Sequence, residues 1–307
     1  MSSKTILVTT ATGTVGSHVA TLLLEQGFKV NALVRNPDSE ASQKLKAQGV
    51  TLFKGDFDDV PSIEVAAEGI YGVFVNGIPT LTNMDEYKQN NNVITAARKA
   101  GAKIGVYMSV VMADLKDQFP GYGPEDPSYN YWEAKYRTEK DLQEAGFDHW
   151  TIIRPAMFMS NFNGRIANYV WPHLQKEHAL VYPSTNTEGL FALVDPLDIG
   201  KFCATPFWDT KTFGEQIIDL STEDITLTNL AEIITKATGI PIKAESITRE
   251  EAKTRGIPER ATQWEDWRAS TGYTVDAERL KTFPIKLSST EAYFERNKDK
   301  TIQFLNQ

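Results

Sequence analysis

The sequence has little cysteine, fewer basic than acidic residues and no long apolar run. A single cysteine, Cys203, among 307 residues excludes an intrachain disulfide framework and fits a reducing compartment. The formal net charge of -8 argues against an electrostatic footprint for nucleic acid or for an anionic membrane. No apolar stretch is long enough for a signal peptide or a membrane span. We therefore expect a cytoplasmic protein with neither nucleic acid nor membrane as a partner.

Several catalytic templates are also missing. No Gly-x-Ser-x-Gly segment, the mark of a nucleophile elbow, occurs in the chain. Cys203 lies in Gly-Lys-Phe-Cys-Ala, where a small core hydrophobe is favoured over a nucleophile. The four histidines are too scattered along the chain to match a zinc pattern, although spacing alone leaves a spatial cluster open: His18, His149, His173 and His178. We predict no metal.

What the chain does contain is a regular alternation of short apolar strands and helical segments. Hydrophobic residues make up 41% of the chain, enough for a sizeable core. Strands are predicted at residues 6–8, 30–34, 50–53, 73–75, 104–108 and 150–153. Helices are predicted at residues 39–47, 63–67, 84–100 and 131–145. This alternation predicts right-handed βαβ crossovers and an α/β fold with a Rossmann-type, doubly wound parallel sheet.

A glycine turn separates the first predicted strand from a helix. Gly13 and Gly16 follow residues 6–8, and Gly27 ends the helix where a C′ glycine belongs. Glycines let backbone N–H groups approach a pyrophosphate at the helix N-terminus, where unpaired donors and the macrodipole favour an anion. This context predicts dinucleotide binding. The alternative is a pair of glycines used only for a turn and for close helix packing.

The segment Thr10-Ala11-Thr12-Gly13-Thr14-Val15-Gly16 resembles the Gly-x-x-Gly-x-x-Gly motif of the NmrA-like family, a branch of the atypical short-chain dehydrogenase/reductases. The first glycine of that motif is a threonine here. A β-branched residue is unfavourable there if the turn needs a positive φ. The resemblance implies cofactor contacts from Thr10, Thr12, Gly13, Thr14, Val15 and Gly16.

Residues just after each strand are the next candidates, because ligands of such sheets lie beyond the carboxyl ends of the strands. Arg35 ends the second predicted strand, about 20 residues after Gly16, where an arginine accommodates a 2′-phosphate and an acid binds a ribose hydroxyl. The nearest acids, Asp38 and Glu40, follow Pro37. The pattern therefore favours NADP(H). The alternative is an ordinary exposed arginine.

Two further loops match the family. Lys54-Gly55-Asp56-Phe57 resembles its Gly-Asp segment, which implies that Asp56 and Phe57 touch the adenine. An aspartate at this position also suits a helix cap. In Asn76-Gly77-Ile78-Pro79, the resemblance implies that Asn76 and Gly77 pass beside the nicotinamide ribose and that Pro79 borders the substrate. By composition alone this segment is simply a loop.

Ser109, Tyr131 and Lys135 are the candidate catalytic residues. Tyr131 and Lys135 are four apart, so they share one helical face. They resemble the Tyr-x-x-x-Lys element of the superfamily, with Ser109 where its Ser or Thr falls. Carbonyl reduction needs an acid at the developing alkoxide, and a phenol with a pKa near 10 needs a nearby cation to serve at neutral pH. The resemblance implies that Lys135 also binds the nicotinamide ribose and that Ser109 orients the substrate oxygen.

An alternative for Tyr131 is membership of an aromatic cluster with Tyr129, Trp132 and Tyr136, since many NmrA-like members lack the tyrosine and keep only the lysine. The charged residues of the same segment, Glu133, Arg137, Glu139 and Lys140, are typical of a solvated helix face.

The segment Arg154-Pro155-Ala156-Met157-Phe158-Met159-Ser160-Asn161-Phe162 resembles the Arg-Pro-x-x-Phe-x-x-Asn segment of the family, which runs under the nicotinamide and into the substrate pocket. The resemblance implies cofactor contacts from Pro155 and Phe158. It implies a substrate pocket formed by Pro79, Trp132, Met157, Asn161 and Phe162. The alternative is a turn-forming proline followed by core aromatics.

These patterns predict an NAD(P)-binding domain at residues 1–155 with a return segment at 191–225, and a smaller α+β substrate domain at 156–190 and 226–307. Two functions from different classes follow. One is an NADPH-dependent reductase that transfers hydride to a small apolar or aromatic carbonyl, imine or enone. The other is a catalytically silent NAD(P) sensor that acts through a protein partner. Tyr131 favours the enzyme.

Overall fold

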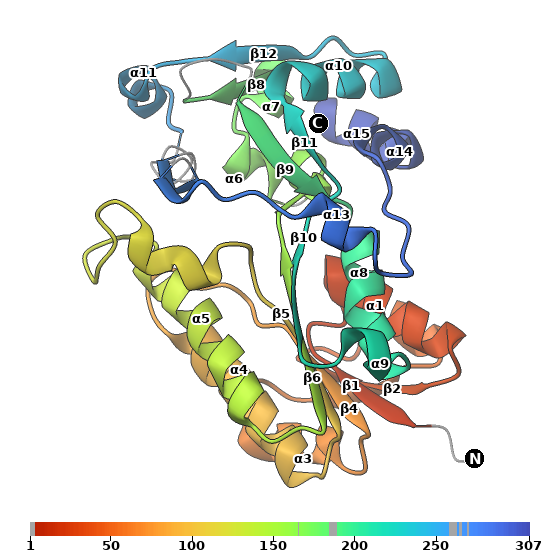
Figure 1. Cartoon of the computed structure of the whole chain (residues 1–307). Coiled ribbons are helices and arrows are strands. Elements are labelled where there is room, and N and C mark those ends of the chain that lie inside the picture. The colour runs from red at the N-terminus through yellow and green to blue at the C-terminus, as the bar shows by residue number, and fades with distance from the viewer. Residues whose placement is uncertain (1–3, 165, 184–188, 258–262, 264–265, 269) are drawn as a thin grey trace. The chain divides into compact units, whose positions relative to one another are not determined.

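The computed structural model describes residues 4–164, 166–183, 189–257, 263, 266–268 and 270–307 (Figure 1). The chain divides into two compact units. The first contains Met1–Lys116, Tyr122–Arg154 and Leu197–Asp219, and the second contains Asp117–Gly121, Pro155–Pro196 and Leu220–Gln307. The part of the chain that returns to the first unit thus lies inside the predicted return segment and is shorter than it.

A seven-stranded sheet in the order β10-β6-β5-β4-β1-β2-β3 forms the first unit. Its strands are β1 (Thr5–Val8), β2 (Lys29–Val34), β3 (Thr51–Lys54), β4 (Gly72–Val75), β5 (Ile104–Met108), β6 (His149–Pro155) and β10 (Gln216–Leu220). The strand pairings from β3 through β6 are all parallel. The predicted Rossmann-type sheet is confirmed, with its topological switch point between β1 and β4. Strand β10 was not among the predicted strands.

The predicted helices of the first unit are also confirmed. They are α1 (Thr14–Glu25), α2 (Glu40–Ala47), α3 (Val60–Ala67), α4 (Asp85–Lys99) and α5 (Tyr129–Glu144), and the return segment adds α8 (Pro196–Ala204) and α9 (Thr210–Phe213). Local signals set their ends. The Ser39 side chain accepts a hydrogen bond from the N–H of Ser42 at the start of α2, and Gly27 follows α1 with a φ of 80°.

Figure 1 shows α3, α4 and α5 on one side of this sheet and α1 with α8 on the other. The first group buries a continuous apolar core against the strands. Ile63 of α3, Val93 of α4 and Leu142 of α5 pack with Tyr107 and Ile152 of the sheet. Helices on both faces explain why the strands read as uninterrupted apolar runs.

The second unit has a smaller α+β organisation, as predicted. Strands β7 (Met157–Phe158), β9 (Leu190–Val194) and β11 (Glu223–Thr226) form one sheet, and β8 (Ala179–Tyr182) pairs with β12 (Lys243–Ser246). Its helices are α6 (Ala167–Val170), α7 (Leu174–Glu177), α10 (Leu227–Thr238), α11 (Arg249–Thr254), α13 (Ala277–Leu280), α14 (Thr290–Arg296) and α15 (Lys298–Leu305).

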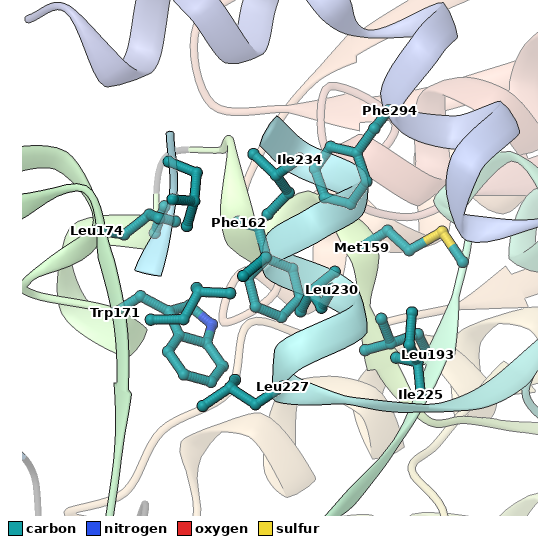
Figure 2. Packing of buried hydrophobic residues seen from close by; sticks show 14 of the residues in the cluster. Met159, Phe162, Trp171, Leu174, Leu193, Ile225, Leu227, Leu230, Ile234 and Phe294 are labelled. Atoms are coloured by element: carbon teal, nitrogen blue, oxygen red, sulfur yellow. The ribbon is translucent and has the colours of Figure 1, made fainter. Parts of the chain in front are cut away.

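An aromatic core holds the second unit together (Figure 2). The ring of Phe162 stacks on Trp171 with centroids 5.0 Å apart. Leu230 and Ile234 of α10 and Phe294 of α14 belong to the same buried cluster. Because α10 places its apolar residues on one face, that helix covers the aromatic pair and buries it.

Two general properties bear on function. None of the described helices is long and apolar enough to cross a membrane. Within the described part of the chain, no group of three or more His, Cys, Asp or Glu side chains is arranged to hold a metal ion.

Candidate dinucleotide-binding and catalytic site

Thr10 forms the turn that follows β1. Its backbone adopts a φ of 46°, in the left-handed region that glycine enters freely and a β-branched residue enters only under strain. The N–H of Gly13 donates to the carbonyl oxygen of Thr10 at 2.8 Å, which closes the turn. The Nδ2 of Asn76 donates to Thr10 Oγ1 at 2.8 Å. The turn therefore needs the positive φ that the family's first glycine supplies.

The two motif glycines allow α1 to start close to this turn. A Cβ added to Gly16 would lie 2.3 Å from the carbonyl oxygen of Thr10, and one added to Gly13 would lie 3.1 Å from it. Gly13 is the N-cap of α1 and offers no side-chain cap, and the first turn of the helix carries no acidic residue. The N-terminal end of α1 thus fits a pyrophosphate, since neither a Cβ nor a carboxylate competes for it.

The ends of β1 and β4 are joined at the switch point by Thr9. The N–H of Asn76 donates to Thr9 Oγ1 at 2.7 Å, and this hydroxyl lies 3.0 Å from the carbonyl oxygen of Phe74. A Cβ on the buried Gly77 would come within 2.9 Å of Glu86 Cγ and 2.8 Å of Asn90 Oδ1. The Asn76-Gly77 loop is therefore fixed between the glycine turn and α4.

The predicted adenine end lies after β2 and β3. Arg35 is exposed directly after β2, and no ion pair involving it occurs among the described residues. Asp56 Oδ1 accepts from the N–H of Asp58 at 3.1 Å, so this carboxylate stabilises its own turn, while Asp59 is the N-cap of α3. Phe57 packs partly buried against the core of the first unit. The exposed guanidinium of Arg35 is available to an anion.

Ser109, Tyr131 and Lys135 all belong to the first unit. Ser109 follows β5, is 3% exposed, and its Oγ is buried without a hydrogen-bond partner in the described structure. Lys135 Nζ lies 5.8 Å from the centroid of the Tyr131 ring, so the expected shared helical face is confirmed. Their predicted roles stay predictions. A buried hydroxyl without a hydrogen-bond partner suits a polar ligand atom.

The ammonium of Lys135 has a partner that the sequence analysis did not single out. Lys135 Nζ lies 2.7 Å from Glu86 Oε1, and the side chains are 4% and 0% exposed. Glu86 shares the buried face of α4 with Asn90, Val93 and Ala97. The sequence did offer one signal for this pair, because Glu86 lies at a position that shares the apolar face of the helix. A carboxylate buried on such a face requires a partner of opposite charge.

The prediction of a solvated face for α5 was wrong for two acids. Glu139 is 1% exposed and Glu133 is 7% exposed, whereas Arg137 and Lys140 are exposed as predicted. Glu139 receives two hydrogen bonds from Arg154, Nε to Oε1 at 2.9 Å and Nη2 to Oε2 at 2.6 Å. Each of these acids can be buried because it forms an ion pair with a cation from another segment, Arg154 for Glu139 and Lys116 for Glu133.

The ion-pair partners shift the pKa values of Arg154 and Glu133. Burial by itself would lower the pKa of Arg154, but the hydrogen bonds and charge of Glu139, with Asp114 and Asp219 nearby, raise it above its usual value. Burial would raise the pKa of Glu133, but hydrogen bonds from Lys116, Tyr122 and Arg137 lower it. The arginine of the Arg-Pro segment therefore has a structural partner in Glu139.

The remaining residues of the Arg-Pro segment lie in the second unit. Met157 and Phe158 are partly buried in β7, and Asn161 is partly buried. Phe162 is fully buried and stacked on Trp171 (Figure 2). The structure places Phe162 in the core of the second unit and not on a pocket surface, so the alternative of core aromatics describes this residue.

Other predicted contacts vary in exposure. Pro155 ends β6 and is buried, whereas Pro79 is exposed. Trp132, in the first unit, is 1% exposed, and its ring meets that of Tyr131 edge-on at 5.2 Å. Trp132 supports the position of Tyr131 and offers almost no surface of its own to a substrate.

Comparisons with known proteins agree with this architecture. The chain is 27% identical over 259 residues to an NAD(P)H azoreductase of Xenophilus azovorans, covering 83% of this chain and 82% of that protein. A solved Escherichia coli NADPH-dependent quinone oxidoreductase in complex with NADPH superposes with a TM-score of 0.73 at 22% identity, covering 93% and 97% of the two chains.

NmrA, a negative transcriptional regulator solved in complex with NADP, superposes with a TM-score of 0.75 at 18% identity, covering 100% of this chain and 99% of that one. At such identities the structural likeness concerns the fold. Residues 2–281 match the NmrA-like family. The chain therefore belongs to the NmrA-like family.

Proposed function

We propose that this chain is an NADPH-dependent reductase that transfers hydride to a small apolar or aromatic carbonyl, imine or enone. The observation that carries the proposal is the placement of Lys135 beside Tyr131 on α5, with the orphan Oγ of Ser109 at the end of β5 in the same unit. The relatives named as an NAD(P)H azoreductase and an NADPH-dependent quinone oxidoreductase support an oxidoreductase.

The glycine turn and Arg35 would hold the cofactor. The N-terminal end of α1 fits the pyrophosphate, and the exposed guanidinium of Arg35 fits a 2′-phosphate through charge-assisted hydrogen bonds. Bound NADPH supplies the hydride. The apolar preference for the substrate rests on Met157 and Phe158, which follow the Arg-Pro pair and keep part of their surface.

The residues of the chain then handle the proton. As hydride reaches the substrate carbon, Tyr131 donates its phenolic proton to the developing oxyanion, and the Lys135 ammonium stabilises the phenolate that forms. Ser109 Oγ donates a hydrogen bond to the same oxygen. The phenol is restored by a proton from solvent, so reduction of a carbonyl consumes one hydride and one proton for each alcohol formed.

The test is NADPH oxidation, followed by absorbance, with a panel of quinones, aldehydes, ketones, imines and enones. Tyr131→Phe should bind NADPH normally and lower kcat by about 10²–10⁴-fold, the range for a lost general acid. Lys135→Ala should weaken both binding and turnover. Tyr136→Phe is the matched control, because its ring lies on α5 beside Lys116 and Lys140, and adjacent residues of a helix do not face each other.

Turnover of Tyr131→Phe equal to that of the unmodified protein would exclude the phenol as proton donor and leave hydride transfer standing. NADPH binding without turnover of any compound in the panel would instead favour the sensor that acts through a protein partner.

A further inference from the structure

We infer that Glu86 is the positioning residue of Lys135, holding its ammonium at one place beside Tyr131 and at a set separation from the Asn76-Gly77 loop. The inference rests on the proposed function, in which Lys135 both stabilises the phenolate and binds the nicotinamide ribose. Glu86 Oε1 lies 2.7 Å from Lys135 Nζ, with exposures of 0% and 4% for the two side chains. The contact joins α4 to α5, which pack side by side (Figure 1).

The burial of Glu86 makes Lys135 its necessary partner. Glu86 lies in the first turn of α4, on the face that also buries Asn90, Val93, Ile94 and Ala97. Removing a carboxylate from water is strongly unfavourable unless a cation compensates it. Apart from Lys135, no protein group within the described structure makes a polar contact with either carboxylate oxygen of Glu86, so the ion pair with Lys135 is the compensation.

The Glu86 side chain also positions the backbone of the Asn76-Gly77 loop. A Cβ on Gly77 would approach Glu86 Cγ to 2.9 Å, so the backbone of the Asn76-Gly77 loop rests directly on the Glu86 methylenes. Asn76 in turn donates to Thr10 of the glycine turn. Glu86 therefore contacts the loop through its aliphatic part and the ammonium through its carboxylate, and it fixes the separation between them.

Two aromatic rings also lie near the ammonium. Lys135 Nζ lies 5.7 Å from the centroid of Tyr107 and 5.8 Å from that of Tyr131. Burial, and then the charges of Glu86 and Glu139, raise the pKa of Tyr107 well above its usual value, so this phenol stays neutral and supplies no competing anion. Ring faces attract a cation without fixing its position closely, whereas a carboxylate at 2.7 Å fixes it.

Position matters because lysine has a long, flexible side chain. A displacement of about 1 Å at a catalytic group can lower a rate by about 100-fold. Glu86→Gln keeps the shape of the side chain and removes its charge, so the ammonium should lose its anchor. We expect kcat to fall by about 10–100-fold and NADPH affinity to weaken, with the KM for the second substrate nearly unchanged.

The decisive experiment is a double-mutant cycle of Glu86→Gln and Lys135→Met, with the NADPH dissociation constant and kcat as readouts. If Glu86 acts through Lys135, Glu86→Gln should change neither quantity further once Lys135 is Met. Asp85→Asn is the matched control, because it removes a neighbouring carboxylate whose pair with Lys88, at 3.5 Å, is solvent-exposed. That variant should behave like the unmodified protein.

Glu86→Gln alone leaves the Lys135 charge buried without a partner and could fail to fold. The double variant removes both charges, so neither is left buried without a partner. Its Tm should exceed that of either single variant, which keeps a folded protein available for the test. Additive effects in the cycle, or Glu86→Gln behaving like Asp85→Asn, would overturn the inference. The NADPH dissociation constants decide it even if no substrate is turned over, so its failure is distinguishable from that of the proposed function.

Discussion

Thr10 combines a strained backbone conformation with a predicted cofactor contact. Its φ of 46° is unfavourable for a β-branched side chain, by about 1–3 kcal/mol for a residue held in a sparsely populated region. The hydrogen bond from Asn76 to its hydroxyl offsets part of this, since such bonds contribute about 0.5–1.5 kcal/mol. The hydroxyl thus compensates for the backbone conformation that the turn imposes.

At this residue scale, Thr10→Gly should leave the free energy of unfolding within about 1.5 kcal/mol of the original, because relief of strain offsets the lost hydrogen bond and the added freedom of the unfolded chain. Thr10→Val keeps the strain and loses the hydroxyl, so it should be less stable than Thr10→Gly. Urea denaturation measures the stability of both variants.

The NADPH affinity of Thr10→Gly should be unchanged or improved. A large loss of affinity would identify the Thr10 hydroxyl as a ligand contact.

At the scale of elements, the buried pair of Arg154 and Glu139 fastens α5 to the end of β6. Arg154 donates two parallel hydrogen bonds to the carboxylate, a geometry that resists small rotations of the helix. Asp114, at 2.9 Å from Arg154 Nη1, is half-exposed and adds a second anion. The helix that carries Tyr131 and Lys135 is therefore held in place by a residue of the Arg-Pro segment.

Glu139→Gln should accordingly destabilise the protein by about 3 kcal/mol, the lower end of the range for breaking a buried ion pair, because Asp114 still compensates part of the Arg154 charge. Glu144→Gln, an exposed position at the end of the same helix, should change the free energy of unfolding by less than about 0.5 kcal/mol. Guanidinium denaturation of the two variants makes the comparison. Equal effects would show that the pair contributes little to stability.

At the scale of the whole molecule, binding of the cofactor should appear as a shift of the unfolding transition. A ligand at 100 times its dissociation constant stabilises the folded state by about 2.7 kcal/mol. If Arg35 pairs with the 2′-phosphate, NADPH should bind more tightly than NADH by about 1–3 kcal/mol. At equal concentrations NADPH should then raise Tm more than NADH does.

Arg35→Ala should remove most of this difference. Lys29→Ala is its control, because Lys29 is an exposed cation at the opposite end of the same strand, β2. Differential scanning fluorimetry with both dinucleotides on the three proteins completes the test. Equal shifts for NADPH and NADH in the unmodified chain would remove the proposed role of Arg35.

The sequence by itself determined the alternation of strands and helices up to residue 155, the glycine turn and the shared face of Tyr131 and Lys135. These are local properties. Apolar periodicity, a glycine after a helix and a four-residue spacing each depend on neighbours within one or two turns of chain. The motif left open whether residue 10 needs a positive φ, and the structure gives it a φ of 46°.

Only the tertiary structure decided which charges are buried and what they contact. Lys135 and Glu86 are 49 residues apart and meet because α4 packs on α5. Glu139 is buried because Arg154 of β6 forms an ion pair with it. Phe162 is a core residue because Trp171 and α10 cover it. A helix face is solvated or buried according to the element that lies against it, and that element comes from a distant part of the chain.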